Sequence, residues 1–332
     1  MADTIMVTGA AGFIGSNFIR YWQESHPSDK IIAVDALTYA GNLRNLDGLD
    51  EIRFIECDIA KTSTIVEILQ RYSVDIIVNF AAESHNSLAV RAPADFFSTN
   101  VMGTIGLLEA IRHVGVHRFH HVSSSEVYGE VEPDNGVPFS EDSPYHPSTA
   151  YSASKAAADH AIRAYCGMYS IPITIGVSVN NYGPFQFPEK IIPLFTTNAL
   201  EGKPLPLYSS TLNRREYIHV TDHCAAIDAI VSRGVVGSTY NVGTGDELTI
   251  EEIADHILTA LKLPASMKKI VPNRPMHSWR HALDSSKIRR ELGWQPKVLF
   301  TVGLVKTVEW YRENFGWWTE SITRRKVKET GW

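Results

Sequence analysis

The segment Thr8-Gly9-Ala10-Ala11-Gly12-Phe13-Ile14-Gly15 decides how this chain begins to fold. It follows a short apolar run at residues 5–8 and opens an amphipathic stretch at residues 13–24. Three glycines between a strand and a helix let the backbone approach a pyrophosphate, which is then held at the helix N-terminus. The pattern therefore predicts a dinucleotide site formed by Gly9, Gly12, Phe13, Ile14 and Gly15.

An acidic residue follows at the distance that such a site requires. Asp35 ends the second predicted strand, about 20 residues after Gly15. A carboxylate there hydrogen-bonds the ribose hydroxyls and repels a 2′-phosphate, so the sequence favours NAD over NADP. Asp58 ends the third predicted strand and is placed to accept from the adenine amino group. The alternative interpretation is a tight turn with a helix-capping aspartate. It requires the strand, the spacing and the acidic residue to occur together by chance.

Short apolar runs alternate with longer amphipathic segments through the first half of the chain. Strands separated by helices form a parallel sheet with right-handed crossovers, and ligands bind beyond the carboxyl ends of its strands. The sequence therefore predicts an α/β fold with a doubly wound parallel (Rossmann) sheet. We expect strands at residues 5–8, 31–34, 53–56, 75–79, 118–123 and 172–178, and helices at 13–24, 61–72, 93–113 and 151–169.

The second half predicts a smaller C-terminal substrate-binding region. Residues 180–184 are typical of a turn, and a helix at 285–292 is expected to begin behind Asp284 and end at Gly293. We assign residues 1–178 and about 217–242 to the cofactor domain, and 179–216 and 243–332 to the substrate region. Further helices are expected at 191–200, 221–232 and 250–261, and strands at 204–208, 217–220 and 239–242.

Composition excludes several classes of protein. The chain has 332 residues and a net charge of −6, from 31 basic and 37 acidic side chains, without the basic patch of a nucleic-acid-binding protein. Three widely spaced cysteines form no disulfide framework. No apolar stretch reaches the ~18 residues of a membrane span, and the N-terminus resembles no signal peptide. We expect a cytoplasmic protein without membrane or nucleic-acid partners.

The second informative motif is Tyr151-Ser-Ala-Ser-Lys155. In a redox site, the Tyr151 phenol takes the proton of a sugar hydroxyl, although phenols ionise only near pH ~10. Lys155 lies one helical turn further on the same face, where its charge is expected to lower the pKa of Tyr151. Ser124, at the end of a predicted strand, is placed to orient the same hydroxyl. An ordinary amphipathic helix is the alternative interpretation.

Glu126 follows the same strand, at the ligand-binding edge of the sheet. The functional hypothesis is a base that removes a proton from a carbon next to a ketone. A solvated loop carboxylate is the alternative interpretation of Glu126.

Four histidines lie close together in the sequence, at His113, His117, His120 and His121. No carboxylate or cysteine near them completes a tetrahedral set of metal ligands, so we expect no metal site.

Seven segments give the chain a resemblance to the extended short-chain dehydrogenases/reductases, and within them to the dTDP-glucose 4,6-dehydratases. The resemblance runs nearly from end to end. Its segments are Asp35-Ala-Leu-Thr-Tyr-Ala-Gly-Asn42, Asn79-Phe-Ala-Ala-Glu-Ser-His85, Glu126-Val-Tyr-Gly129, Tyr151-Ser-Ala-Ser-Lys155, Asn180-Asn-Tyr-Gly-Pro184, Phe187-Pro-Glu-Lys190 and Ile288-Arg-Arg-Glu-Leu-Gly-Trp294.

The resemblance implies a redox-neutral cycle on a nucleotide-diphosphate sugar linked to dTDP or UDP. Tyr151 and Ser124 assist oxidation at C4, Glu126 removes the C5 proton, water leaves from C6, and the hydride returns to C6. The resemblance also implies a homodimer formed through residues 93–113 and 151–169. It assigns Ile59 and Ala81 to the cofactor, and Ser84, Asn181, Lys190, Arg215 and Arg280 to the substrate.

The chain departs from the family pattern at the edges of the expected pocket. Ser125 stands where these dehydratases carry the aspartate that protonates the leaving hydroxyl, and a serine hydroxyl is no useful acid at neutral pH. His85-Asn86-Ser87-Leu88 replaces His-Val-Asp-Arg, Ser209-Ser210-Thr211 replaces Gly-Asp-Gly, and Ser278-Trp279-Arg280 replaces Asp-Arg-Arg.

These departures leave alternatives open. In GDP-mannose 4,6-dehydratases, which also have Ser at this position, the glutamate can serve as both base and acid. A UDP-glucuronate decarboxylase needs no such acid, but it needs an arginine for the carboxylate, for which Arg280 is the candidate. A 4-epimerase, a dehydratase that forms a 5,6-ene sugar, and a non-catalytic NAD-binding sensor are the others. Tyr151, Lys155 and Ser124 argue against the sensor, and we expect the 4,6-dehydratase.

Overall fold

A seven-stranded parallel sheet forms the centre of the computed structural model, which describes residues 2–132, 136–273 and 278–323. Its strand order reverses between β1 and β4, as in a doubly wound fold, so the predicted fold class is confirmed. In spatial order the strands are β10 (Thr239–Val242), β6 (Ile173–Ser178), β5 (Arg118–Ser124), β4 (Ile76–Asn79), β1 (Thr4–Thr8), β2 (Lys30–Asp35) and β3 (Ile52–Glu56).

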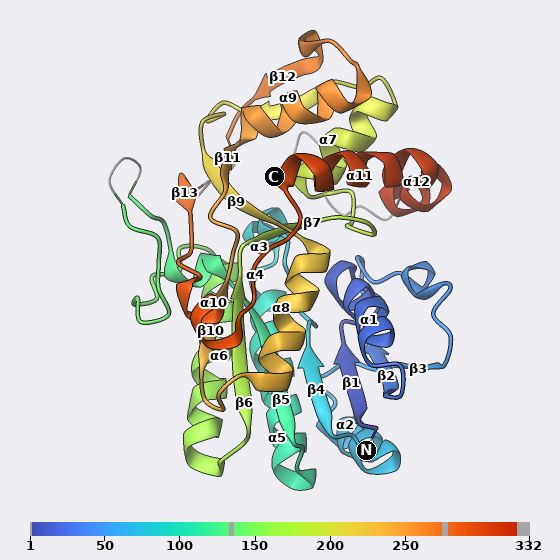
Figure 1. Cartoon of the computed structure of the whole chain (residues 1–332), viewed down its shortest axis with the longest axis vertical. Coiled ribbons are helices and arrows are strands. Elements are labelled where there is room, and N and C mark those ends of the chain that lie inside the picture. The colour runs from blue at the N-terminus through green and yellow to red at the C-terminus, as the bar shows by residue number, and fades with distance from the viewer. Residues whose placement is uncertain (1, 133–135, 274–277, 324–332) are drawn as a thin grey trace.

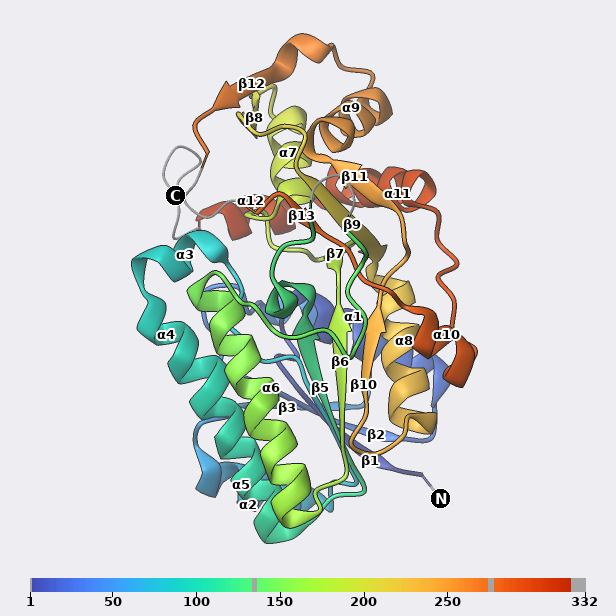
Figure 2. The same cartoon turned by 90° about the vertical axis from the view of Figure 1, so that its left-hand side faces the viewer.

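Helices cover both faces of this sheet (Figures 1 and 2). The strands are therefore apolar on both sides, as the continuous runs of Ile and Val predicted. One face carries α2 (Thr62–Tyr72), α4 (Pro93–Phe97), α5 (Thr104–Val114) and α6 (Ala150–Tyr169); the other carries α1 (Phe13–Ser25), α8 (Val220–Arg233) and α10 (Ser286–Leu292).

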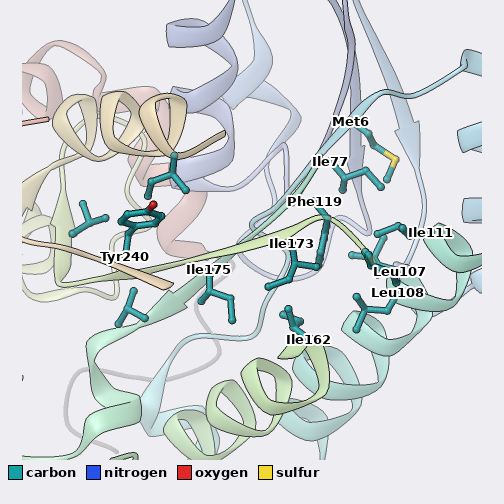
Figure 3. Close-up of a cluster of buried hydrophobic side chains, with 14 of the residues drawn as sticks. Met6, Ile77, Leu107, Leu108, Ile111, Phe119, Ile162, Ile173, Ile175 and Tyr240 are labelled. Carbon is teal, nitrogen blue, oxygen red and sulfur yellow. The ribbon is translucent and has the colours of Figure 1, made fainter. Parts of the chain in front are cut away.

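The larger core cluster lies between the sheet and the α2–α5–α6 layer. Figure 3 shows Phe119 and Ile173 of neighbouring strands directed toward Leu108 of α5 and Ile162 of α6. All four side chains are fully buried. This packing fixes the ends of β5 and α6, which carry the predicted catalytic residues.

The C-terminal region lies beyond the carboxyl ends of the strands (Figure 1). It contains a second sheet of β7, β9, β11 and β13, a two-stranded sheet of β8 and β12, and its own apolar cluster. Its elements are β7 (Asn180–Tyr182), α7 (Ile191–Leu200), β8 (Leu205–Tyr208), β9 (Arg214–His219), β11 (Glu247–Thr249), α9 (Ile250–Leu261), η4 (Ala265–Met267), β12 (Lys268–Val271), β13 (Arg280–His281), α11 (Phe300–Glu313) and α12 (Phe315–Thr323).

The segment 217–242 divides between the two regions. Its helix α8 packs on α1 and its strand β10 pairs with β6, so the chain returns to the central sheet. Residues 217–219, in contrast, belong to β9 in the second sheet. Residues 324–332 of the expected substrate region lie outside the described residues.

Two predicted elements differ in the structure. Residues 180–182 form β7, paired with β9, rather than the start of a turn, because their partner lies far along the chain. Residues 93–113 form the predicted helix, but a π-helical turn, η2 (Ser98–Gly103), lies between its α-helical parts α4 and α5. Within that turn, Asn100 hydrogen-bonds the backbone of Glu83. Near the C-terminus, α10 ends at Gly293 in the left-handed conformation, as predicted.

Candidate active site

A cavity of about 510 Å³ lies between the central sheet and the C-terminal region. It includes the end of β1 and the loop after β4, where the strand order reverses. Doubly wound proteins bind ligands at this switch point. All predicted site residues line the cavity except Ser125 and Arg280.

The glycine segment forms the first wall of this cavity. Gly9 has a left-handed φ of +65°, and a Cβ placed on it would lie 2.7 Å from the Ala81 backbone nitrogen. Helix α1 starts behind Gly12 and receives no side-chain cap from the described residues. Because Phe13, Ile14 and Gly15 line the cavity, the positive end of this helix is presented to whatever occupies it.

Asp35 and Asp58 lie on the same wall. Asp35 is 8% exposed, and its two carboxylate oxygens accept from Ala11 N at 2.9 Å and Leu37 N at 2.8 Å. Burial raises the pKa of Asp35, while these two N–H groups oppose that change. Asp58 accepts from Ala60 N at 2.9 Å, beside Ile59. Backbone N–H groups thus hold both carboxylates at the carboxyl ends of β2 and β3.

Tyr151 and Ser124 meet on the opposite wall. Helix α6 begins with a capping box in which Thr149 and Ser152 satisfy each other's backbone N–H groups, which fixes the turn that carries Tyr151. The Ser124 hydroxyl, at the end of β5, hydrogen-bonds the phenol. Burial, followed by the charge of Glu126, raises the pKa of Tyr151. This direction is opposite to the lowering that we expected from Lys155.

The position of Lys155 explains the difference. Its Nζ donates to the Val122 carbonyl at 2.7 Å and lies 3.1 Å from His121 Nε2. Burial lowers the pKa of Lys155 to about 8, although the nearby Asp159 carboxylate favours the charged form. The ammonium group is therefore directed toward β5, and a buried network continues from His121 to Asn79.

Glu126 lies in the cavity, whereas Ser125 does not. Both belong to η3 (Ser125–Tyr128), a 3₁₀ turn in which neighbouring side chains point to different sides. Asn86 Nδ2 lies 3.0 and 3.1 Å from the two Glu126 carboxylate oxygens. Ser125 is 3% exposed and lies outside the cavity lining.

The far end of the cavity carries the predicted substrate residues Ser84, Asn181, Lys190 and Arg215. Lys190 Nζ donates to the Ser84 carbonyl at 2.7 Å, which joins two lining segments. Arg215 is 7% exposed, and its guanidinium donates to the Ser278 carbonyl at 2.6 Å. This end therefore places two cationic side chains in the cavity.

Arg280 is not brought to the cavity. Its guanidinium forms a bidentate pair with Glu247, with both N···O distances 2.6 Å, and donates to the Gly136 carbonyl at 2.9 Å. Glu247 lies on β11, on the other side of β9 from β13, which carries Arg280. Because Arg280 is paired so closely with Glu247, it is unsuited to the substrate-binding role that the sequence predicted.

Asn86 and His223 are among the lining residues that the sequence analysis did not predict as site residues. Asn86 contacts Glu126 from a segment 40 residues away, and His223 accounts for the position of Asn181. Asn181 Nδ2 donates to the Val179 carbonyl, so its Oδ1 must accept from His223 Nδ1 at 2.8 Å. Neither contact leaves a periodic signal in the sequence.

The histidines on β5 have other partners. His120 Nδ1 lies 3.0 Å from the Thr174 hydroxyl, and His121 bonds Asn79 and Lys155. Within residues 2–132, 136–273 and 278–323, no three His, Cys, Asp or Glu side chains are grouped as a metal site. No helix in the described part of the chain combines the length and apolarity needed to cross a membrane.

Comparison with known proteins places this geometry in a family. Residues 6–307 match the family model described as GDP-mannose 4,6 dehydratase. The dTDP-glucose 4,6-dehydratase of Streptomyces niveus is 42% identical over 95% of this chain and 94% of its own length. The corresponding enzyme of Neisseria meningitidis is 40% identical over the same shares.

Solved structures agree. DesIV, a dTDP-glucose 4,6-dehydratase from Streptomyces venezuelae with NAD and TYD bound, superposes with a TM-score of 0.92 at 43% identity, covering 96% of this chain and 99% of its own. A UDP-glucose 4-epimerase from Thermotoga maritima gives 0.88 at 28% identity, covering 94% and 99%. The shared fold thus spans several nucleotide-sugar chemistries. The chain belongs to the GDP-mannose 4,6 dehydratase family of extended short-chain dehydrogenases/reductases.

Proposed function

We propose that this protein is an NAD-dependent nucleotide-sugar 4,6-dehydratase that acts on a dTDP-linked hexose. One observation carries the proposal: a single cavity joins the glycine segment and Asp35 to Ser124, Glu126 and Tyr151. A dinucleotide site without these three side chains would only bind its cofactor. The similarity to dTDP-glucose 4,6-dehydratases along 95% of the chain supports the same reaction.

The residues of the first wall fit NAD. A pyrophosphate suits the close approach of Gly9 to Ala81 and the uncapped start of α1. A ribose without a 2′-phosphate suits the carboxylate of Asp35. Gly12, Phe13, Ile14 and Gly15 would hold the pyrophosphate, and Asp58, Ile59 and Ala81 the adenosine side. When bound, NAD would accept a hydride from the sugar and later return it.

The chain supplies the proton transfers. Tyr151 takes the proton of the C4 hydroxyl, which Ser124 orients, and Lys155 fixes the same helix against β5. The resulting C4 ketone acidifies C5, from which Glu126 removes the proton. Since Ser125 lies outside the cavity, Glu126 also returns that proton to the hydroxyl leaving C6. A hydride at C6 and a proton taken up from solvent at C5, equal in number to the one that Tyr151 took from C4, complete a 4-keto-6-deoxy sugar.

The substrate end fits a nucleoside diphosphate. Arg215 and Lys190 bring positive charge, and Asn181 and Ser84 bring polar contacts, to the part of the cavity beyond Tyr151. Arginine matches the geometry of phosphate oxygens. The relative solved with NAD and TYD supports the dTDP form. Residues 1–178 and about 217–242 would accordingly bind NAD, and 179–216 and 243–332 the nucleotide sugar.

The decarboxylase alternative is less well supported, because the arginine expected to bind the sugar carboxylate lies outside the cavity lining. It needs a cation for the C6 carboxylate, and Arg280 is paired with Glu247 outside the cavity lining. The 4-epimerase alternative requires Tyr151 and Ser124 but no base at C5. It therefore leaves the position of Glu126 in the cavity unexplained.

Product mass separates the dehydratase from the decarboxylase and the epimerase. The purified protein with NAD is incubated with dTDP- and UDP-linked glucose, N-acetylglucosamine and glucuronate, and the products are read by mass spectrometry. We expect loss of water, fastest with dTDP-glucose. Loss of carbon dioxide would establish the decarboxylase, and an isomer of unchanged mass the epimerase. NAD that stays bound while no sugar changes would establish the sensor.

We also propose a homodimer formed through α4 to α6. Large apolar side chains are exposed there: Phe97 at 41%, Met102 at 56% and Met168 at 69%. Exposed large apolar side chains on these helices are typical of a surface that a second chain covers. Met102→Glu should shift the mass measured by light scattering from two chains toward one, whereas an unchanged mass would place the interface elsewhere.

A further inference from the structure

Asn86 is the first residue of α3 (Asn86–Arg91) and lines the cavity beside Glu126. Its side-chain nitrogen lies 3.0 Å from one carboxylate oxygen of Glu126 and 3.1 Å from the other. The contact joins residues 40 positions apart, on two different elements. Neither residue lies in the segment that carries Tyr151.

Chemistry fixes the orientation of this amide. An ionised carboxylate only accepts hydrogen bonds, so the NH₂ group of Asn86 faces Glu126 and its oxygen faces the other way. That oxygen accepts from the Thr149 hydroxyl at 3.3 Å. The Thr149 hydroxyl oxygen in turn accepts from Ser152 N at 3.1 Å.

These three hydrogen bonds form one directed chain. Every donor points toward the carboxylate, from the Ser152 N–H through Thr149 and Asn86 to Glu126. Thr149 is the N-cap of α6, the helix that presents Tyr151. The chain therefore ties the carboxylate to the helix that carries the phenol, and sets the distance between the two proton-transferring groups.

The link matters because Ser125, the chain neighbour of Glu126, brings no acid into the cavity. Ser125 is buried outside the lining, and Asn86 occupies a position where the family pattern has valine, which has no donor. A carboxylate that must serve two carbons in succession has to stay within reach of both. A displacement of about 1 Å in such a site costs on the order of 10²-fold in rate.

We propose that Asn86 is a positioning residue that holds Glu126 so that this one carboxylate carries both proton steps of dehydration; the inference rests on the proposed function. The Glu126 carboxylate forms an O–H bond as the C5–H bond breaks. The released electron pair forms the C5=C6 bond while the C6–O bond breaks. The proton then passes from Glu126 to the departing oxygen, which leaves as water, and the carboxylate is restored.

The test compares oxidation at C4 with loss of water in single turnovers of the NAD-loaded protein with dTDP-glucose. Absorbance of the reduced nicotinamide reports the first step, and product mass in quenched samples reports the second. In Asn86→Val, we expect the reduced form to appear within about 2-fold of the wild-type rate but to persist, because water is lost about 10- to 100-fold more slowly. KM should hardly change, since Asn86 acts through Glu126.

Two further variants complete the design. Asn86→Asp keeps the size but replaces the donor with a second carboxylate, so it should lose water at least as slowly as Asn86→Val. It also serves as the test should the valine variant fail to fold. Val90→Asn, a reciprocal change on the same helix at a side chain 49% exposed, is the matched control and should behave as wild type.

The outcomes separate the two proposals. Water loss at the wild-type rate in Asn86→Val or Asn86→Asp would overturn the role of Asn86 and leave the dehydratase intact. Equal slowing of both steps would also overturn it, because that result indicates general damage to the site. A wild-type protein that turns over without losing water would refute the proposed function, and the role of Asn86 with it.

Discussion

Replacing Gly9 by alanine should damage both stability and cofactor binding, for two separable reasons. The backbone at Gly9 has a φ of +65°, which costs a residue with a Cβ about 1–2 kcal/mol. The new methyl group would also lie 2.7 Å from Ala81 N and 2.8 Å from the Phe80 carbonyl carbon. Overpacking against rigid backbone adds about 1–3 kcal/mol, so the free energy of unfolding should fall by roughly 2–5 kcal/mol.

Two other glycines isolate these contributions. Gly48 has a φ of +75° with nothing within 4 Å of the added Cβ, so Gly48→Ala should show the backbone strain alone. Gly167 lies in α6, also with nothing within 4 Å, and Gly167→Ala should stabilise the protein by about 0.5–1 kcal/mol. Unfolding free energies come from denaturant titrations of the NAD-free proteins.

NAD affinity provides the second readout. The clash in Gly9→Ala displaces the backbone that faces the pyrophosphate, and a charge-assisted hydrogen bond contributes about 1.5–3 kcal/mol. We therefore expect calorimetric Kd values for NAD to rise about 10- to 100-fold in Gly9→Ala and to remain unchanged in the other two variants. If Gly9→Ala is no less stable than Gly48→Ala and binds NAD normally, the contact with Ala81 does not shape the site.

Three other predictions concern the chemistry and the buried histidine. Glu126→Gln should bind NAD normally but lower the rate of water loss by ~10²–10⁴-fold, measured by product mass; normal turnover would remove the carboxylate from the mechanism. Tyr151→Phe should slow the first hydride step, seen as lost transient NADH, and an undiminished transient would contradict its role as base. Burial lowers the pKa of His223 from its ordinary value of 6.5 to about 3. Between these two pH values, His223 therefore binds a proton in the unfolded chain but not in the folded chain. Stability should fall as the pH drops from 6.5 toward 3, and His223→Gln should show a shallower fall in thermal midpoint; equal slopes would refute this.

The chain's local patterns determined the fold and the cofactor wall. Apolar runs and helical periodicity depend on burial along consecutive residues, so they predicted all seven central strands and most of the helices. The glycine segment and Asp35 were also predictable, because a turn's conformation and a strand's end are properties of neighbouring residues. The spacing of Tyr151 and Lys155 placed both on one helix face for the same reason.

Tertiary structure alone decided which charges meet. Arg280 was expected at the substrate but pairs with Glu247, and Lys155 is held by His121 and the Val122 carbonyl, so the predicted lowering of the Tyr151 pKa does not occur. The side chain beside Glu126 is likewise Asn86 rather than the adjacent Ser125. Hydrogen bonds and burial depend on distances between elements that lie far apart in the chain, and no local period of the sequence records those distances.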